Sequence, residues 1–137
     1  MTLTFRGIRE QVFVDTFLNP ANFAELVEFT PVGGTPRDIV VHLEPESDYQ
    51  VIDTQTGEQM DQLVVLASKN PSATGSDGRL RGGIDQARIG DRIVRRAVVD
   101  ARQEPYTFTG IIRENHQYKW RLEFRRRARP DQGVPRD

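Results

Sequence analysis

The sequence predicts a mainly β protein: a small antiparallel β-barrel or sandwich with one short N-terminal helix and a long flexible loop. Three observations indicate this fold class. Apolar residues recur with helical spacing only near the N-terminus, later segments alternate with a period of two, and 11 Gly and 8 Pro supply turns. At 137 residues the chain has the length of one domain. We expect a helix within residues 1–19, a barrel over 20–129 with the flexible loop at 69–83, and a disordered tail at 130–137.

The predicted helix covers residues 4–18 and ends at Asn19-Pro20, because proline disfavours the α conformation in the residue before it. A helix this short is marginal alone, so it must dock on its own barrel or on a neighbouring molecule. Helical spacing places four large apolar residues on one side, and we regard them as a candidate docking surface: Phe5, Ile8, Val12 and Phe17.

The predicted strands are short segments bounded by turn residues. They cover residues 25–30, 38–44, 49–53, 63–67, 89–94, 106–113 and 117–127. The segment at 98–102 is ambiguous between strand and loop. The segment at 63–67, LVVLA, is apolar on both faces and is expected to be central. The last two strands are expected to form a hairpin.

The last strand has the clearest alternation in the chain, which describes one buried face and one solvent-exposed face of an antiparallel sheet. The inward residues are Tyr118, Trp120, Leu122 and Phe124, and the outward residues are Lys119, Arg121, Glu123 and Arg125.

Charge is distributed unevenly along the chain, although the net charge is −1. Residues 1–68 hold 3 Lys+Arg and 11 Asp+Glu, whereas residues 69–137 hold 16 and 9. Folding can neutralise the two halves against each other, which is the interpretation we favour. Alternatively, copies of the chain present opposite charges to one another in a head-to-tail ring.

The residues that carry catalysis or bind metals are scarce. The chain has no cysteine, two histidines, and neither an HExxH nor a GxSxG motif. The Gly-rich segment 69–83 lacks the phosphate-binding patterns GxxxxGK[ST] and GxGxxG. No apolar run is long enough to span a membrane, and no signal peptide is expected. We therefore expect no enzymatic activity and no catalytic, metal-binding or cofactor-binding residues.

A basic cluster at the end of the last strand consists of Arg125, Arg126, Arg127 and Arg129. Consecutive residues on a strand alternate sides, so the cluster is expected to surround the end of the strand. It can contact phosphates without sequence preference, meet a neighbouring subunit, or form a solvated or salt-bridged surface. We expect reversal of the three consecutive charges to impair assembly or DNA retention more than folding of the monomer.

The stretch at 17–34, FLNPANFAELVEFTPVGG, followed by RDIVVHLE, resembles the start of the small head–tail joining proteins of tailed bacteriophages, also called head-closure, stopper or neck proteins. The Gly90-Asp91 turn before a strand and the closing strand around Leu122 are also similar to that family. The resemblance covers most of residues 17–127. Phe29 stands where the family often has Tyr, and the loop at 69–83 and the Arg-rich C-terminus are less typical.

The resemblance implies a β-barrel subunit of the virion that has no enzymatic role. Copies would form a ring of twelve or six at the head–tail interface, closing the DNA-filled head below the portal and docking the tail. The implied partners are other copies of the chain, the portal or adaptor ring and tail proteins, with non-specific contact to packaged DNA and none to a membrane. The implied location is the virion, and the host cytoplasm during assembly. Arg79 and Arg81 in the loop would face a neighbouring subunit or the DNA channel.

Two alternatives remain open. The chain is a tail terminator or another tail-proximal ring protein, or it is a β-barrel module that binds nucleic acid without sequence preference. The last alternative predicts DNA binding by the isolated chain with a steep dependence on salt.

Overall fold

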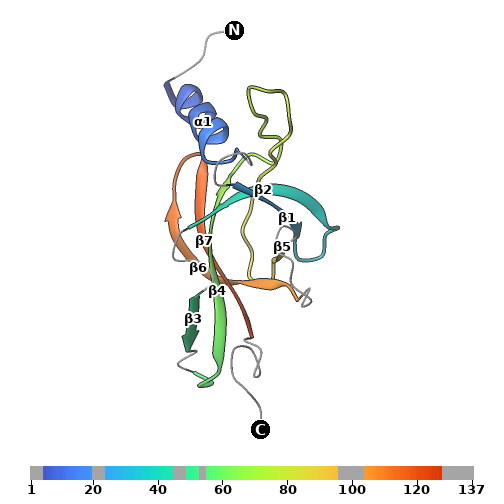
Figure 1. The fold of residues 1–137 in the computed structure, drawn as a ribbon, viewed down its shortest axis with the longest axis vertical. Coiled ribbons are helices and arrows are strands. Elements are labelled where there is room, and N and C mark those ends of the chain that lie inside the picture. The colour runs from blue at the N-terminus through green and yellow to red at the C-terminus, as the bar shows by residue number, and fades with distance from the viewer. Residues whose placement is uncertain (1–4, 20–23, 45–48, 53–54, 96–103, 128–137) are drawn as a thin grey trace.

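The computed structural model describes residues 5–19, 24–44, 49–52, 55–95 and 104–127, and all structural statements below refer to these residues. The side chains of Phe5, Arg6 and residues 49–51 are not among the parts described. The helix is α1 (Phe5–Thr16), and the strands are β1 (Ala24–Thr30), β2 (Arg37–Leu43), β3 (Tyr49–Ile52), β4 (Gln59–Ser68), β5 (Arg92–Arg95), β6 (Tyr106–Asn115) and β7 (Lys119–Arg127) (Figure 1).

The strands form a closed antiparallel barrel of six strands, which confirms the predicted fold class. The order in the sheet is β2-β1-β5-β6-β7-β4-β3, and β4 closes the barrel by pairing with β2. One edge of β4 is shared, because Gln59 to Gln62 pair with β3 whereas Val65 and Leu66 pair with β2. β3 therefore extends the sheet past the end of the barrel. The predicted segment at 98–102 and the tail at 130–137 lie outside the described residues.

Alternate residues of the strands fill the barrel, as the period of two requires. Ile39 and Val41 from β2, like Leu122 and Phe124 from β7, lie in one buried cluster. The other buried members of this cluster are Val27, Phe29, Leu63, Val65, Ala67, Ile84, Ile93, Tyr106 and Phe108. The inward face predicted for the last strand is thus confirmed at its two central residues.

Helix α1 docks on the outside of its own barrel. Phe13, Val14 and Leu18 form a second buried cluster with Val40 of β2 and Leu66 of β4. Leu63 and Val65 lie in the cluster inside the barrel, whereas Leu66 lies in the cluster under the helix. The LVVLA segment is apolar on both faces because each face packs against a different cluster. Of the two docking sites expected for the helix, its own barrel is therefore the one that the structure shows.

Each end of the barrel interior is closed by a side chain from β7. At one end the Trp120 indole N–H donates to the carbonyl oxygen of Ile84 at 2.7 Å, and the Lys69 ammonium lies 4.2 Å from the ring centroid. At the other end the Arg126 guanidinium lies 4.2 Å from the Tyr106 ring centroid. Trp120 is only partly buried, since it caps the core and does not lie within it.

The loop at 69–83 makes specific backbone contacts with the barrel. The Val40 N–H donates to the carbonyl oxygen of Arg81 at 2.7 Å, and the Ile84 N–H donates to that of Ser68 at 2.8 Å. Within the loop, Thr74 and Leu80 form an isolated β-bridge. The segment is therefore a loop, as predicted, whose base continues the hydrogen bonding of β2 and β4. Its predicted flexibility stays a prediction.

Ion pairs connect the acidic and basic halves of the chain. Arg95 contacts Glu25 at 2.8 Å and Arg121 contacts Glu44 at 2.8 Å. Asp61 and Glu58 of the acidic half likewise contact arginines of β7, which are described below. The favoured interpretation of the charge asymmetry, neutralisation within one chain, is supported at these positions.

Candidate interaction surfaces

Helix α1 carries more apolar side chains than its barrel covers. Phe13 is 3% exposed, whereas Ile8, Val12 and Phe17 are 47%, 56% and 43% exposed. With Tyr118 and Lys119 from the β6–β7 turn region, these residues line a shallow depression of about 240 Å³. An apolar face this exposed on a docked helix is typical of a protein-binding surface.

Of the four predicted docking residues, Ile8, Val12 and Phe17 are exposed on α1, and their role in docking stays a prediction. Phe5 begins the helix, but its side chain is not among the parts described. The sequence pattern did not reveal that Phe13, one residue from Val12, lies on the barrel side. The helix has two apolar faces: one packs on its own barrel, and the other is exposed to solvent.

The tip of the loop is bonded to the same helix. The Asp15 carboxylate accepts from the Ser76 N–H at 2.7 Å and from the Ser76 hydroxyl, and the Gln11 amide donates to the Thr74 carbonyl oxygen at 3.1 Å. The Ser76 hydroxyl, and then its N–H, hold the pKa of Asp15 below its ordinary value of 3.8, although burial opposes this. Figure 1 shows the loop and α1 at the same end of the molecule.

The two loop arginines have different environments. Arg79 is exposed near the tip. Arg81 is buried, and its guanidinium contacts the Asp77 carboxylate at 2.8 Å while its Nε–H has no hydrogen-bond partner within the described structure. Of the two residues expected to face a neighbour or DNA, only Arg79 is turned outward in this structure.

The three consecutive arginines of β7 also separate, as the alternation of a strand requires. Arg125 faces outward and contacts Glu123 at 2.7 Å, Arg126 faces the end of the barrel, and Arg127 is exposed and contacts Glu58 at 3.2 Å. Arg129 lies outside the described residues. These residues surround the end of the strand and do not form one basic stripe.

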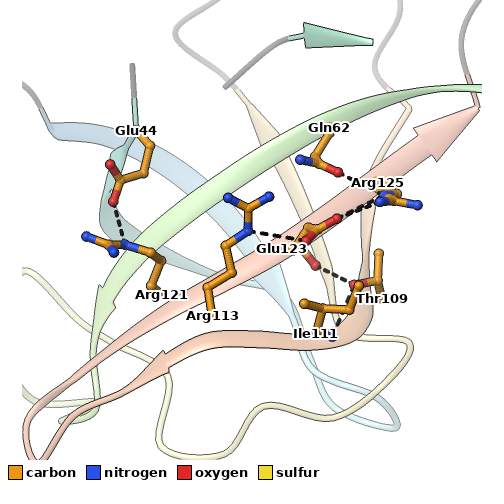
Figure 2. Close-up of polar contacts among 8 residues, drawn as sticks. All are labelled: Glu44, Gln62, Thr109, Ile111, Arg113, Arg121, Glu123 and Arg125. Carbon is orange, nitrogen blue, oxygen red and sulfur yellow. Dashed lines mark hydrogen bonds and ion pairs between the residues drawn. The ribbon is translucent and has the colours of Figure 1, made fainter. Parts of the chain in front are cut away.

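Glu123 is the centre of a polar network on the outer face of β7 (Figure 2). Its carboxylate lies between Arg113, at 3.3 Å, and Arg125, and Arg125 also donates to the Gln62 side chain at 3.0 Å. Glu123 is buried, so the predicted solvent-exposed face of this strand is wrong at this residue. The reason is that the long arginine side chains cover the carboxylate. Arginine two residues away on the same face, at Arg125, is the sequence signal for such a contact.

A groove of about 460 Å³ lies beside this network. Its lining includes Ile52 of β3, Met60 of β4, Ile111 of β6 and Arg125. Ile52 and Ile111 are exposed. The groove therefore mixes apolar and polar side chains, and Arg125 is the one charged residue in its lining.

Within the described part of the chain, no three His, Cys, Asp or Glu side chains are grouped in a way that could hold a metal ion. No helix of the described residues is long and apolar enough to cross a membrane. Comparison with protein-family models, with curated proteins and with solved structures finds no match for this chain.

Proposed function

We propose that this protein is a structural subunit of a bacteriophage neck, which forms a ring that closes the DNA-filled head below the portal and docks the tail. The observation that carries the proposal is the exposed face of α1, made of Ile8, Val12 and Phe17, on a helix that its own barrel already holds. The resemblance of residues 17–34 to head–tail joining proteins supports the choice of partner. The small closed barrel is compatible with a ring subunit of this kind.

The helix is suited to binding a protein partner. Phe13, Val14 and Leu18 fix it on β2 and β4, so its outer residues are presented on a rigid element and not on a free peptide. Pre-ordering lowers the entropy that binding must offset. We infer that the portal, adaptor or tail ring docks over Ile8, Val12 and Phe17.

The alternative of a nucleic-acid-binding module has weaker support. Arg125, Arg126 and Arg127 contact Glu123, Asp61 and Glu58 respectively, so phosphate binding would have to displace an acidic partner at each. The other alternative, a tail-proximal ring protein, would use the same face of α1. It differs from the proposed function only in the partner that this face binds.

The decisive experiment is reconstitution of infectivity. Heads made by a phage or prophage that lacks this gene are mixed with tails and with the purified protein, and plaques and retained DNA are measured. We expect the wild-type protein to restore both. Val12→Glu, which places a charge on the exposed face, should fail to restore them while keeping the wild-type melting temperature.

Ile89→Glu is the matched control, because Ile89 is an exposed isoleucine that does not belong to the helix surface. It should restore plaques as well as the wild type does. Infectious particles, with tails joined to DNA-filled heads, formed in the absence of the gene would refute the proposal. Location of the gene among metabolic genes, instead of genes for portal, capsid and tail proteins, would also refute it.

A further inference from the structure

Arg81 is a buried arginine of the loop at 69–83, and the proposed docking face makes no direct use of it. Only 6% of its side chain is exposed, and its guanidinium contacts the Asp77 carboxylate at 2.8 Å. Its Nε–H has no hydrogen-bond partner within the described residues. Burial of a charged group costs free energy, which one ion pair offsets only in part. An arginine in this position is suited to organising the loop and not to meeting a neighbour or DNA.

The tip of the loop is folded around this guanidinium. A Cβ added to Gly75 would lie 2.8 Å from the Nε of Arg81 and 3.0 Å from its Nη2, so the backbone of Gly75 packs directly against the charged group. The Asp77 carboxylate that pairs with Arg81 also accepts from the Arg79 N–H at 3.0 Å. The Arg81 N–H donates to the carbonyl oxygen of Ala73 at 2.7 Å, which closes the turn. The conformation of the tip thus depends on Arg81.

The tip in turn holds α1 at two positions one helical turn apart. The Asp15 carboxylate accepts from the N–H and the hydroxyl of Ser76. The Gln11 amide donates to the Thr74 carbonyl oxygen and to Asp15, both at 3.1 Å, since residues four apart share one side of a helix. The Ser76 hydroxyl contributes most to the lowered pKa of Asp15, and the positive charge of Arg81 acts in the same direction. Figure 1 shows the loop extending alongside α1.

The loop also connects the helix to the barrel. Ala73 is 3% exposed and lies with Phe13 in the second buried cluster, so the loop adds an apolar contact to the polar ones. At the base of the loop the Val40 N–H donates to the carbonyl oxygen of Arg81 at 2.7 Å. The main chain of Arg81 is therefore bound to β2 while its side chain supports the tip. One residue links the barrel to the tip and, through the tip, to the helix.

The contacts of the tip hold the part of α1 that precedes its apolar anchors. Among the described residues, the helix side of the second buried cluster begins at Phe13, and no earlier side chain of α1 belongs to a buried cluster. Gln11 lies between these anchors and the exposed Ile8. A helix of 12 residues is marginal alone, so its first turns need a tertiary contact to stay in place. The loop supplies that contact.

We propose that the loop at 69–83 is a strap that holds the first half of α1 in the orientation that presents Ile8 and Val12, and that Arg81 is the positioning residue of this strap. The strap is closed when a partner ring binds. Arg81 does not touch the partner: it orders the tip, and the tip orders the helix. The part of this inference that concerns partner binding rests on the proposed function, whereas the coupling of loop and helix does not.

Amide hydrogen exchange of the isolated full chain tests the coupling. Ser76→Ala removes the hydroxyl that binds Asp15, and leaves Arg81 and the barrel unchanged. We expect the amides of residues 9–16 to exchange about tenfold faster in this variant, because loss of a hydrogen bond to a charged group weakens the closed strap. The amides of β7 should keep their wild-type protection.

Variants of Arg81 test its role as the positioning residue in the same measurement. Arg81→Ala should raise exchange in the helix and also in the tip, at residues 73–79. Arg81→Lys should restore the protection in part, since it keeps the charge but loses the planar fork of donors. Arg79→Ala is the matched control, because Arg79 is an exposed arginine of the same loop. It should change the exchange of neither segment.

A disulfide that can be closed and opened tests the role of the strap in partner binding. Asp15→Cys with Ser76→Cys replaces two side chains that are in direct contact, in a chain that has no other cysteine. The monomer is isolated after oxidation with diamide, which closes the strap covalently, and half of it is then reduced. We expect the oxidised form to restore infectivity to heads that lack the gene product as well as the wild type does. The reduced form should restore about tenfold fewer plaques, because fewer molecules present the helix in the binding orientation. The wild type treated in the same two ways is the control.

The strap would be overturned by the absence of a disulfide under oxidation, or by unchanged helix exchange in both Ser76→Ala and Arg81→Ala. Exchange that rises equally throughout β7 would overturn it as well. Plaques restored by the reduced form alone would show that the strap must open, and equal restoration by both forms would show that it has no part in docking; either result overturns the positioning role. Failure of the wild type to restore infectivity, together with faster helix exchange in the variants, would refute the proposed function and leave the coupling standing.

Discussion

Arg126 and Asp61 form an ion pair at 3.3 Å between directly opposed residues of β7 and β4, and their side chains are only 10% and 8% exposed. The same guanidinium lies over the Tyr106 ring. A basic residue that the sequence places in a surface cluster thus closes one end of the barrel core. The consequence is that the arginines of β7 differ in what they contribute to stability.

Arg126→Ala is expected to lower the free energy of unfolding by about 3 kcal/mol, because it leaves the Asp61 carboxylate buried without its partner. Arg127→Ala removes an exposed ion pair and is expected to cost less than about 1 kcal/mol. Urea titration of both variants measures the difference. The double variant Asp61→Ala/Arg126→Ala should cost less than the sum of the single changes, because neither charge is then left alone. Equal stability of the Arg126 and Arg127 variants would show that the pair is solvated.

This geometry bears on the sequence expectation that reversing Arg125, Arg126 and Arg127 together impairs assembly or DNA retention more than folding of the monomer, because Arg126 is buried against Asp61. The alternation rule correctly predicts that the three side chains separate. It does not say which neighbour each one meets, because Asp61 and Glu58 reach these arginines only through the pairing of β4 with β7. Register between strands distant in sequence is set by packing of the whole barrel, and a single strand carries little information about it.

Gly83→Ala is expected to destabilise the protein by about 3 kcal/mol, since overpacking against a fixed backbone cannot relax. A Cβ at this position would lie 2.5 Å from the Asn70 carbonyl oxygen and 2.6 Å from that of Ser68. Gly78 is the matched control in the same loop, because it has a positive φ of 80° but nothing within 4 Å of an added Cβ. Gly78→Ala should cost about 1 kcal/mol from the left-handed backbone alone. Thermal unfolding compares the two, and an unaffected Gly83 variant would mean that the base of the loop is not held against β4.

The Asp15–Ser76 contact is expected to depend on pH. The folded pKa of Asp15 lies below the ordinary 3.8 because the Ser76 hydroxyl and N–H stabilise the carboxylate. A carboxyl with a depressed folded pKa contributes stability that is fully present above the ordinary value and is lost as the pH falls through the folded pKa. An NMR titration of the Asp15 carboxyl carbon should therefore give a midpoint below 3.8, which Ser76→Ala moves up towards that value. An identical midpoint in the variant would show that the loop tip does not bind the helix in solution.

The fold class and the exposed helix face could be predicted from the sequence because both depend on local periodicity. The spacing of Ile8, Val12 and Phe17 is a property of one helix, and the alternation around Leu122 and Phe124 is a property of one strand. Burial of Glu123 and the inward turn of Arg81 could not be predicted in this way. Glu123 depends on its contact with Arg113, and Arg81 depends on its contact with Asp77. The residue types alone identify Glu123 and Arg81 as polar surface positions.

Phe13 and Val12 are neighbours on α1, and replacing them should separate folding from partner binding. Phe13→Ala is expected to cost about 3 kcal/mol and to release the helix from Val40 and Leu66, because it leaves a cavity in the second core cluster. Val12→Ala is expected to change stability by less than about 0.5 kcal/mol, since the residue is more than half exposed and is not a member of either core cluster. If the exposed face of α1 binds a partner ring, Val12→Ala should nevertheless lower the yield of restored plaques. Circular dichroism during thermal unfolding and plaque restoration give the two readouts on the same samples. Loss of stability in Val12→Ala with unchanged restoration would mean that this side of the helix serves the fold of the chain instead of a docking partner.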